Sequence, residues 1–189
     1  MGRRFSKTLG RKTHGNPQAN ISTLNEDEAL ALLDELSEVP FLLILDQLQD
    51  PRNLGACLRS ADAAGVNLVI MSSDRSASLT DVVRHVAAGA AEALPLARVR
   101  NLARFMKELN ERGIKMVGTS DQAKSTIFDS DLKGPLALVV GAEGTGIRRL
   151  TADNCDVLMN IPMGGTVECL NVSVATGVCL FEAFRQRRN

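Results

Sequence analysis

Polar side chains set among small residues distinguish residues 50–66, DPRNLGACLRSADAAGV. Asp50 and Pro51 form a predicted turn, and Asn53 occupies the expected cap position of a helix, where its side chain can satisfy a free backbone N–H group. Arg59 follows six residues later, most of two turns into the predicted helix. The small residues around Arg59 would let this helix approach a ligand or another backbone closely. A helix cap and a surface ion pair are the alternative interpretations.

Glycine dominates a second segment, LVVGAEGTGIRRL at 138–150. An apolar run leads into Gly141, and Glu143 is held between this glycine and Gly144. The spacing is not the G-x-G-x-x-G of dinucleotide-binding proteins, because position 149 is arginine, and no Gly-Lys-Ser/Thr of a P-loop follows. The segment instead predicts a backbone that approaches a small ligand closely. A tight strand-to-helix turn that needs glycine for positive φ is the alternative.

The third segment, IPMGGTVECLNVSVATGVCLFEAF at 161–184, joins a predicted strand to the last predicted helix. Pro162 and a Gly-Gly pair form a loop, and Asn171 and Ser173 stand at the start of the helix. Helix capping is the alternative to a binding role for these two side chains. The small residues at 175–177 indicate close packing against another element or a second subunit.

Short apolar runs alternate with helical stretches over most of the chain. The predicted strands are 41–46, 67–72, 97–99, 114–119, 136–141 and 157–161. The predicted helices are 26–38, capped by Asn25 with Glu28, and 53–64, 79–93, 101–112, 147–154 and 170–186. Strands that are apolar throughout are buried on both faces, so the fold class is α/β, a parallel sheet flanked by helices. Ligands of such sheets bind beyond the carboxyl ends of the strands, where the three segments begin.

Composition limits the ways in which the chain could bind a partner. Of its 189 residues, 44% are apolar and 23% charged, the balance of a soluble globular protein. We predict a basic N-terminal arm and short helix at 1–38, irregular to about residue 24, and a main domain at 39–189. Residues 1–12 hold five basic residues and no acid, which could contact phosphates. Because aromatic residues are 3% and Trp and Tyr are absent, nucleic-acid binding would rely on backbone contacts and shape more than on stacking.

The sequence disfavours a metal site and contact with a membrane. The four cysteines form no C-x-x-C pair, and there are only two histidines, so no metal site of standard spacing is expected. No run approaches ~20 apolar residues, and the start has no apolar signal-peptide core. We therefore expect a cytoplasmic protein with reduced thiols.

Together and in this order, the three segments resemble the signature motifs of the SpoU/TrmH family in the SPOUT superfamily of methyltransferases. The resemblance rests on NLGACLRSADAAG, VVGAEGTGIRRL and IPMGG…LNVSVATGVCLFEA, and it runs from about residue 39 to 187. DRSASLTDVVRHVAAGAAEALPL at 74–96 is similar to the bacterial enzymes that 2′-O-methylate a guanosine of 23S rRNA. The resemblance implies an enzyme that transfers a methyl group from S-adenosylmethionine to a ribose 2′-hydroxyl of structured RNA.

The same resemblance implies further features of the fold and the site. Relatives carry a deep C-terminal trefoil knot, hold the cofactor largely by backbone, and form homodimers through the last helix and the helix of the first motif. The expected cofactor-binding residues in this sequence are Thr119, Gly141, Ile161, Met163 and Leu170. The expected catalytic residues are Arg59, Asn53, Glu143 and Asn171.

Arg59 matches the arginine that the family treats as catalytic, in some accounts as the base itself. Because a guanidinium pKa above ~12 leaves almost no neutral form at pH 7, our hypothesis gives Arg59 a phosphate-orienting and alkoxide-stabilising role. Asn53 and Asn171 would position the ribose. Glu143 would orient Arg59 or accept the proton, and these two roles stay open.

Two departures from the family pattern affect the expected substrate and site. Cys169 stands where many relatives have serine, with Glu168 beside it. The rRNA enzymes usually carry a substrate-binding domain before the catalytic one, and only about 38 residues stand there in this chain. The alternatives to an rRNA enzyme are a tRNA guanosine 2′-O-methyltransferase and a non-catalytic RNA-binding or ribosome-assembly module with the same fold.

Overall fold

The central strands are apolar up to their last residue because helices cover both faces of the sheet. The computed structural model describes residues 22–188 and contains a seven-stranded sheet in the order β3-β2-β1-β6-β4-β7-β5, with parallel neighbours throughout. The strands are β1 Phe41–Asp46, β2 Leu68–Ser72, β3 Leu96–Val99, β4 Lys115–Thr119, β5 Ser125–Thr126, β6 Leu136–Gly141 and β7 Val157–Asn160. Every residue of β1, β2 and β6 is buried. The predicted α/β class is confirmed, and the six predicted strands lie within one residue of their expected bounds.

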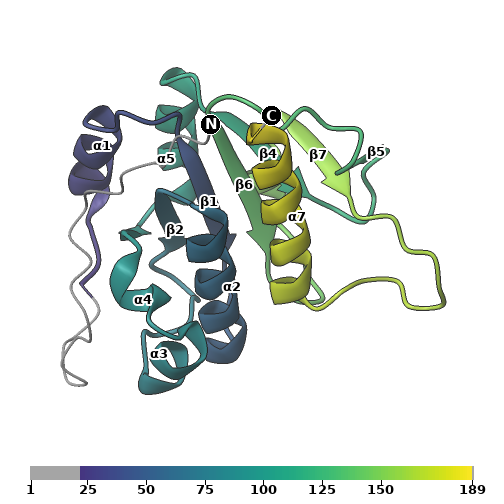
Figure 1. Ribbon diagram of the computed structural model, residues 1–189, viewed down its shortest axis with the longest axis horizontal. Coiled ribbons are helices and arrows are strands. Elements are labelled where there is room, and N and C mark those ends of the chain that lie inside the picture. The colour runs from purple at the N-terminus through teal and green to yellow at the C-terminus, as the bar shows by residue number, and fades with distance from the viewer. Residues whose placement is uncertain (1–21, 189) are drawn as a thin grey trace, which may run out of the picture.

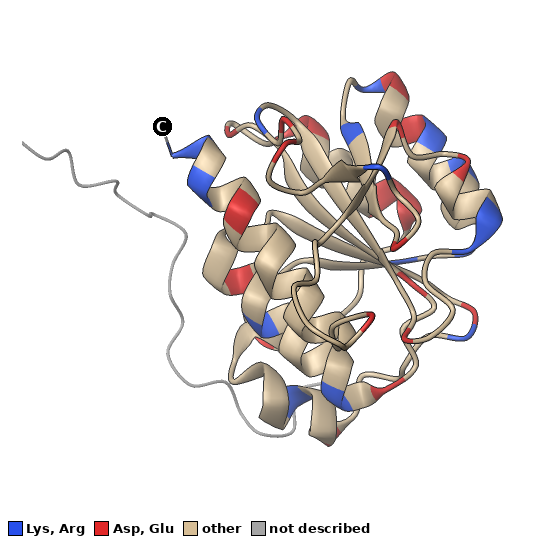
Figure 2. Cartoon of the chain, turned by 90° about the vertical axis from the view of Figure 1, so that its right-hand side faces the viewer, with Lys and Arg blue, Asp and Glu red and all other residues tan. Residues whose placement is uncertain are grey.

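Each face of the sheet has its own apolar core under a layer of helices (Figures 1 and 2). The helices are α1 Glu26–Asp34, α2 Pro51–Ala64, α3 Asp81–Ala87, α4 Ala90–Ala93, α5 Leu102–Glu111, α6 Arg149–Ala152 and α7 Val172–Arg187. Leu43 and Leu45 of β1 belong to the core that α2, α3, α4 and α7 cover. Leu42 and Ile44 belong to the core that α1 and α5 cover. This alternation follows from the two-residue period of a strand.

The segment before β1 is attached to the main domain at the edge of the sheet. Asn25 and Glu28 form the predicted capping box, with Glu28 N donating to Asn25 Oδ1 at 3.0 Å and Asn25 N donating to Glu28 Oε2 at 2.8 Å. Leu24 forms a parallel bridge with β3. α1 ends at Asp34 rather than at the predicted residue 38. Just after its end, Leu36 N donates a hydrogen bond to Leu33 O, three residues back instead of four. Of the arm predicted over 1–24, residues 1–21 lie outside the described residues. The predicted domain boundary near residue 39 stays a prediction.

The single helix predicted over 79–93 is wrong, because two left-handed residues divide it. Ala88 has φ 52° and Gly89 has φ 93°, so the chain turns between α3 and α4. α3 then packs closely on α2 at Gly55, where an added Cβ would lie 2.8 Å from both the Val83 carbonyl oxygen and the Val86 Cβ. Gly55 therefore permits the close α2–α3 contact that holds the first motif in place.

The last helix does not lie over the strand that precedes it. β7 pairs with β4 and β5, whereas α7 packs beside α2 and contacts β6 (Figure 1). Residues 161–171 therefore carry the chain from β7 back toward the middle of the sheet. General topology rules count knots as almost absent, and the trefoil knot that the family resemblance implies stays a prediction.

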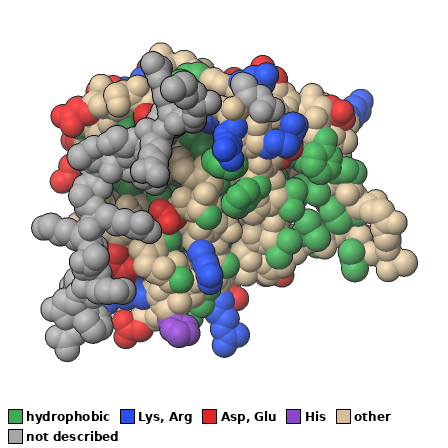
Figure 3. Space-filling view, viewed as in Figure 1, with side chains coloured by type: hydrophobic (Ala, Val, Ile, Leu, Met, Phe, Trp, Pro, Cys, Tyr) green, Lys and Arg blue, Asp and Glu red, His purple; other side chains and the backbone are tan. Residues whose placement is uncertain are grey.

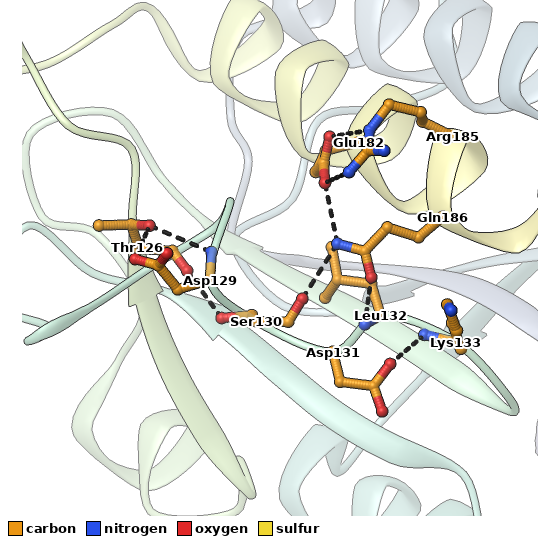
Figure 4. Close-up of polar contacts among 9 residues, drawn as sticks. All are labelled: Thr126, Asp129, Ser130, Asp131, Leu132, Lys133, Glu182, Arg185 and Gln186. Carbon is orange, nitrogen blue, oxygen red and sulfur yellow. Dashed lines mark hydrogen bonds and ion pairs between the residues drawn. The ribbon is translucent and has the colours of Figure 1, made fainter.

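The C-terminal turn of α7 is hydrogen-bonded to the loop between β5 and β6 (Figure 4). Gln186 Nε2 donates to the Ser130 carbonyl oxygen, and its Oε1 accepts from Leu132 N, both at 3.0 Å. Glu182 Oε1 accepts from Gln186 Nε2 at 2.8 Å, and its carboxylate forms two hydrogen bonds with Arg185. Because these bonds favour the charged carboxylate, they lower the pKa of Glu182 to about 2, the Arg185 bond contributing most.

Acid should weaken these hydrogen bonds of Glu182, and Glu182→Gln should remove the pH-dependent stability that its carboxylate contributes. A carboxyl group whose pKa is lowered by folding stabilises the fold above its unfolded pKa of 4.5, and this contribution is lost as pH falls from there toward about 2. We expect the melting temperature of E182Q to lie below that of the wild type at pH 7 and the difference to shrink below pH 4.5.

The matched control for this experiment is Glu111→Gln, because Glu111 is exposed and its side chain makes no hydrogen bond or ion pair within residues 22–188. Calorimetric melting of the three proteins from pH 3 to 7 provides the measurement. A constant difference between E182Q and the wild type over that range would contradict the coupling between ionisation and folding.

Candidate active site

The carboxyl ends of β1, β6, β4 and β7 are neighbours, and they assemble most of the expected site. Asp46, the last residue of β1, pairs in register with Gly141, the last residue of β6. Thr119, the last residue of β4, pairs with Met159 of β7, and Ile161 follows two residues later. The structure therefore brings the expected cofactor-binding residues at 119, 141 and 161 to one edge of the sheet, as the strand-end rule predicts.

Hydrogen bonds join one side chain from each of the three motif segments. Asn53 Nδ2 donates to Glu143 Oε2 at 3.2 Å, and Asn171 Nδ2 donates to Asn53 Oδ1 at 3.1 Å. The partners are 90 and 118 residues apart in the sequence, so the fold rather than local preference brings them together. Within the described part of the chain, one N–H of each amide and Oε1 of Glu143 have no hydrogen-bond partner. These groups can hydrogen-bond a hydroxyl group.

The helix cap predicted at Asn53 is wrong. α2 begins two residues earlier than expected, with Pro51 at its first position and Asp50 as the cap, whose side chain accepts from Arg52 N at 2.8 Å. Asn53 then lies inside the first turn, 8% exposed, and its side chain is free to bond across to Glu143. Asn171 is the cap of α7, because its Oδ1 accepts from Ser173 N at 2.9 Å, and it bonds Asn53 as well.

Arg59 is not part of this network. It lies six residues beyond Asn53 on α2, about 240° around the helix axis at 100° per residue. Its side chain is exposed and makes no hydrogen bond or ion pair within residues 22–188. The contact between Glu143 and Arg59 that the sequence suggested is therefore absent from the described structure, and the guanidinium is available to an external group.

A glycine turn and an ion pair to a buried carboxylate shape the loop that carries Glu143. Ala142 and Gly146 exchange two backbone hydrogen bonds, of 3.1 and 2.9 Å, and Gly146 has φ 65°. Arg148, which ends the loop, donates from its N to Asp46 Oδ2 at 3.0 Å and from its Nε to Oδ1 at 2.8 Å. This pair was not predicted from the sequence. The available signal was a carboxylate at the end of an otherwise apolar strand, since such a buried charge requires a partner.

The loop from β7 to α7 has unpaired backbone groups and partly exposed apolar side chains. Within the described structure no hydrogen bond involves residues 162–170. Met163 and Leu170 lie on this loop and, like Ile161, are half-buried. Backbone donors and acceptors beside apolar side chains suit an adenine ring with its attached sugar and amino acid. The residues present therefore fit the cofactor that the motifs imply, although they do not form a closed cavity.

Thiol chemistry does not account for this site. Burial raises the pKa of Cys57 to about 11 and that of Cys155 and Cys179 to about 12, so these thiols are protonated at neutral pH. Cys169 is exposed on the loop after β7, with Glu168 exposed beside it. Among residues 22–188, no group of three or more His, Cys, Asp or Glu side chains could hold a metal ion. No helix in that range is long and apolar enough to cross a membrane.

A family comparison accounts for the order and spacing of the three segments. The model of the SpoU rRNA Methylase family matches residues 40–181, a range that includes the first two motifs, the third as far as Phe181, and both asparagines of the network. The chain belongs to the SpoU rRNA Methylase family. The resemblance drawn from the motifs is thereby confirmed.

A curated relative belongs to the subgroup of 23S rRNA guanosine methyltransferases that residues 74–96 resemble. The protein of Pectobacterium atrosepticum named 23S rRNA (guanosine-2'-O-)-methyltransferase RlmB is 61% identical over 162 residues. The alignment covers 86% of this chain and 66% of the relative. The chain therefore spans slightly less than two thirds of the length of that protein.

Solved SpoU structures share the fold. The methyltransferase AviRb from Streptomyces viridochromogenes, crystallised in complex with AdoMet, is 30% identical with a TM-score of 0.73, covering 80% of this chain and 62% of AviRb. The TrmH/SpoU tRNA modifying enzyme of A. aeolicus is 30% identical with a TM-score of 0.72, covering 86% of this chain and 84% of that protein. This chain thus has the fold of SpoU methyltransferases.

Proposed function

We propose that this chain transfers a methyl group from S-adenosylmethionine to a ribose 2′-hydroxyl of structured RNA, with a guanosine of 23S rRNA as its substrate. The observation that carries the proposal is the network of Asn53, Glu143 and Asn171, one residue from each SpoU motif, at the edge where the cofactor-binding segments meet. The name of the Pectobacterium relative supports the choice of RNA. An rRNA substrate also agrees with the cytoplasmic location expected from the sequence.

The reaction requires an oxygen nucleophile to be aligned and deprotonated. Bound S-adenosylmethionine supplies an electrophilic methyl group on a positively charged sulfur. For the ribose 2′-oxygen to take this methyl group, with the demethylated cofactor as the neutral leaving group, the residues of the site would have to hold the hydroxyl in line and accept its proton. The unused amide N–H groups of Asn53 and Asn171 can donate to the ribose and hold its hydroxyl in line. The free carboxylate oxygen of Glu143 is the proton acceptor in this proposal.

Arg59 contributes positive charge without contacting the asparagine network of its own chain. Its exposed guanidinium can bind the phosphate next to the target ribose and lower the energy of the developing alkoxide. The absence of an Arg59–Glu143 contact favours the proton-accepting role of Glu143 over the role of orienting Arg59. A guanidinium also keeps its charge at neutral pH, which suits electrostatic stabilisation.

A homodimer would complete the apolar surface beside α7. Hydrophobic side chains gather next to this helix, on the side of β7 and the loop that follows it (Figure 3). Val174 and Phe181 of α7 are 52% and 47% exposed, and Val167 of the loop is 63% exposed. Exposed apolar side chains of this size, when they gather in a patch, mark interaction sites. Pairing α7 and α2 with the same helices of a second copy would cover them.

The proposal is tested by methyl transfer from radiolabelled S-adenosylmethionine into RNA. We expect transfer into a 23S rRNA fragment and none into the same fragment with 2′-deoxyguanosine at the modified position. Equal transfer into the deoxy fragment would rule out the ribose oxygen as acceptor. Calorimetry with S-adenosylmethionine alone separates an enzyme from a non-catalytic RNA-binding module, because the module would show no binding.

The A. aeolicus neighbour, described as a tRNA modifying enzyme, supports one alternative substrate. A tRNA arm in the same assay distinguishes the two RNA classes. Preferential methylation of tRNA over the 23S rRNA fragment would replace rRNA by tRNA as the substrate and would leave the site and the chemistry of the proposal unchanged.

A further inference from the structure

A buried carboxylate at the end of β1 fixes the loop that carries Glu143. The Asp46 side chain is 0% exposed, and among the described residues 22–188 all the hydrogen bonds and ion pairs of its carboxylate are with Arg148. Arg148 Nη2 lies 2.6 Å from Asp46 Oδ1, in addition to the bonds from its backbone N and its Nε. A fully buried carboxylate is stable only when it is paired and hydrogen-bonded. The position of Arg148 is therefore set by β1.

Both ends of the loop between β6 and α6 are consequently fixed to the same strand. Gly141 enters the loop in register with Asp46, and Arg148 leaves it bound to the Asp46 carboxylate. The Ala142–Gly146 hydrogen bonds close the turn between these two points. Glu143 lies within the closed turn and is exposed, and in the part of the chain that the structure describes its side chain has one hydrogen-bond partner, Asn53. The direction in which Glu143 points thus depends on the Asp46–Arg148 pair.

From this geometry we infer that Asp46 and Arg148 are positioning residues for methyl transfer, acting through Glu143 and Gly141 rather than on the RNA. The inference rests on the proposed function of the site, but the geometric link from Arg148 to Asn53 can be tested without any activity. Arg148 is 45% exposed, so binding of an RNA phosphate is the competing role. The two roles predict different kinetic and spectroscopic changes.

The first measurement is the side-chain amide signal of Asn53 in ¹⁵N-correlated NMR spectra of the full chain. We expect Arg148→Gln to shift this signal in the same direction as Glu143→Ala, because both changes remove the carboxylate from Asn53. Arg148→Lys keeps a charge opposite Asp46 but cannot make both the Nε and the Nη2 contact, so it should shift the signal less in the same direction. It provides a second variant if the glutamine substitution unfolds the protein. An unchanged Asn53 signal in a folded Arg148 variant would overturn the inference, whether or not the wild type methylates RNA.

The second measurement is steady-state methylation by the same variants. We expect R148Q to lower kcat by about 10- to 100-fold, the loss typical of a small misplacement of a reacting group, with little change in KM for RNA. In an E143Q background the further loss should be much smaller, since both residues act through one contact. A raised KM with unchanged kcat and a shallower salt dependence would instead assign Arg148 to an RNA phosphate.

The matched control is Arg112→Gln, which removes another arginine–aspartate pair. Arg112 Nε lies 3.4 Å from Asp34 Oδ1 at the end of α5, and both side chains are exposed. This pair is remote from the glycine loop, on the side of the sheet where β4 begins. R112Q should leave kcat and the Asn53 signal at their wild-type values.

Discussion

Replacing Gly141 by alanine should destabilise the fold and abolish tight cofactor binding. A Cβ at this position would meet the backbone of Gly146 and the N of Ile147 well inside 3.0 Å, closer than real Cβ atoms approach other atoms. The neighbours are backbone atoms of a closed turn, so they cannot move aside as a flexible side chain would. We expect the free energy of unfolding to fall by about 3 kcal/mol, at the upper end of the usual cost of overpacking, and S-adenosylmethionine affinity to fall at least tenfold.

Urea denaturation and calorimetry with S-adenosylmethionine provide the two measurements for G141A. The control for stability is Gly164→Ala, because a Cβ at Gly164 would have no atom within 4 Å. That substitution should change the free energy of unfolding by less than about 1 kcal/mol. Wild-type stability and cofactor affinity in G141A would show that the loop does not hold the closed turn described above.

The sheet could be predicted from sequence because its strands are buried on both faces. The runs FLLIL and LALVV have no polar residue to suggest a solvated face, and Asp46 and Gly141 end these two strands at their observed boundaries. The break between α3 and α4 was missed because Ala88 is a strong helix former, yet it adopts a left-handed conformation here. Helix propensity does not predict a left-handed residue that tertiary packing requires.

The site was predicted in its residues more than in its contacts. The motifs identified Asn53, Glu143 and Asn171, but Asn53 looked like a helix cap because an asparagine two residues after an Asp-Pro turn suits either role. The Asp46–Arg148 pair joins residues 102 positions apart, and neither has a local signal for the other. Contacts at that separation depend on the strand order, which the apolar pattern alone leaves open.

Removal of the Arg59 guanidinium should lower kcat strongly and leave the free energy of unfolding almost unchanged. Arg59→Ala should lower kcat by about 10²- to 10³-fold, the usual loss when one donor to a developing oxyanion is removed. The free energy of unfolding should change by less than about 0.5 kcal/mol, because the side chain is exposed and makes no hydrogen bond or ion pair within residues 22–188. Affinity for S-adenosylmethionine should be retained. Arg52→Ala, another exposed arginine on α2, is the matched control and should stay near wild-type activity.

Arg59→Lys separates an electrostatic role from a role as base. A lysine ammonium has a pKa of about 10.4, against about 12.5 or more for a guanidinium, so at pH 8 lysine would supply far more of the neutral form. If residue 59 acts as the base, R59K should therefore turn over at least as fast as the wild type. If it binds a phosphate and an alkoxide through two N–H donors, R59K should be slower, because the ammonium lacks the planar pair of N–H donors. We expect R59K to lose at least about tenfold in kcat, as the electrostatic role requires, and near wild-type turnover by R59K would contradict it.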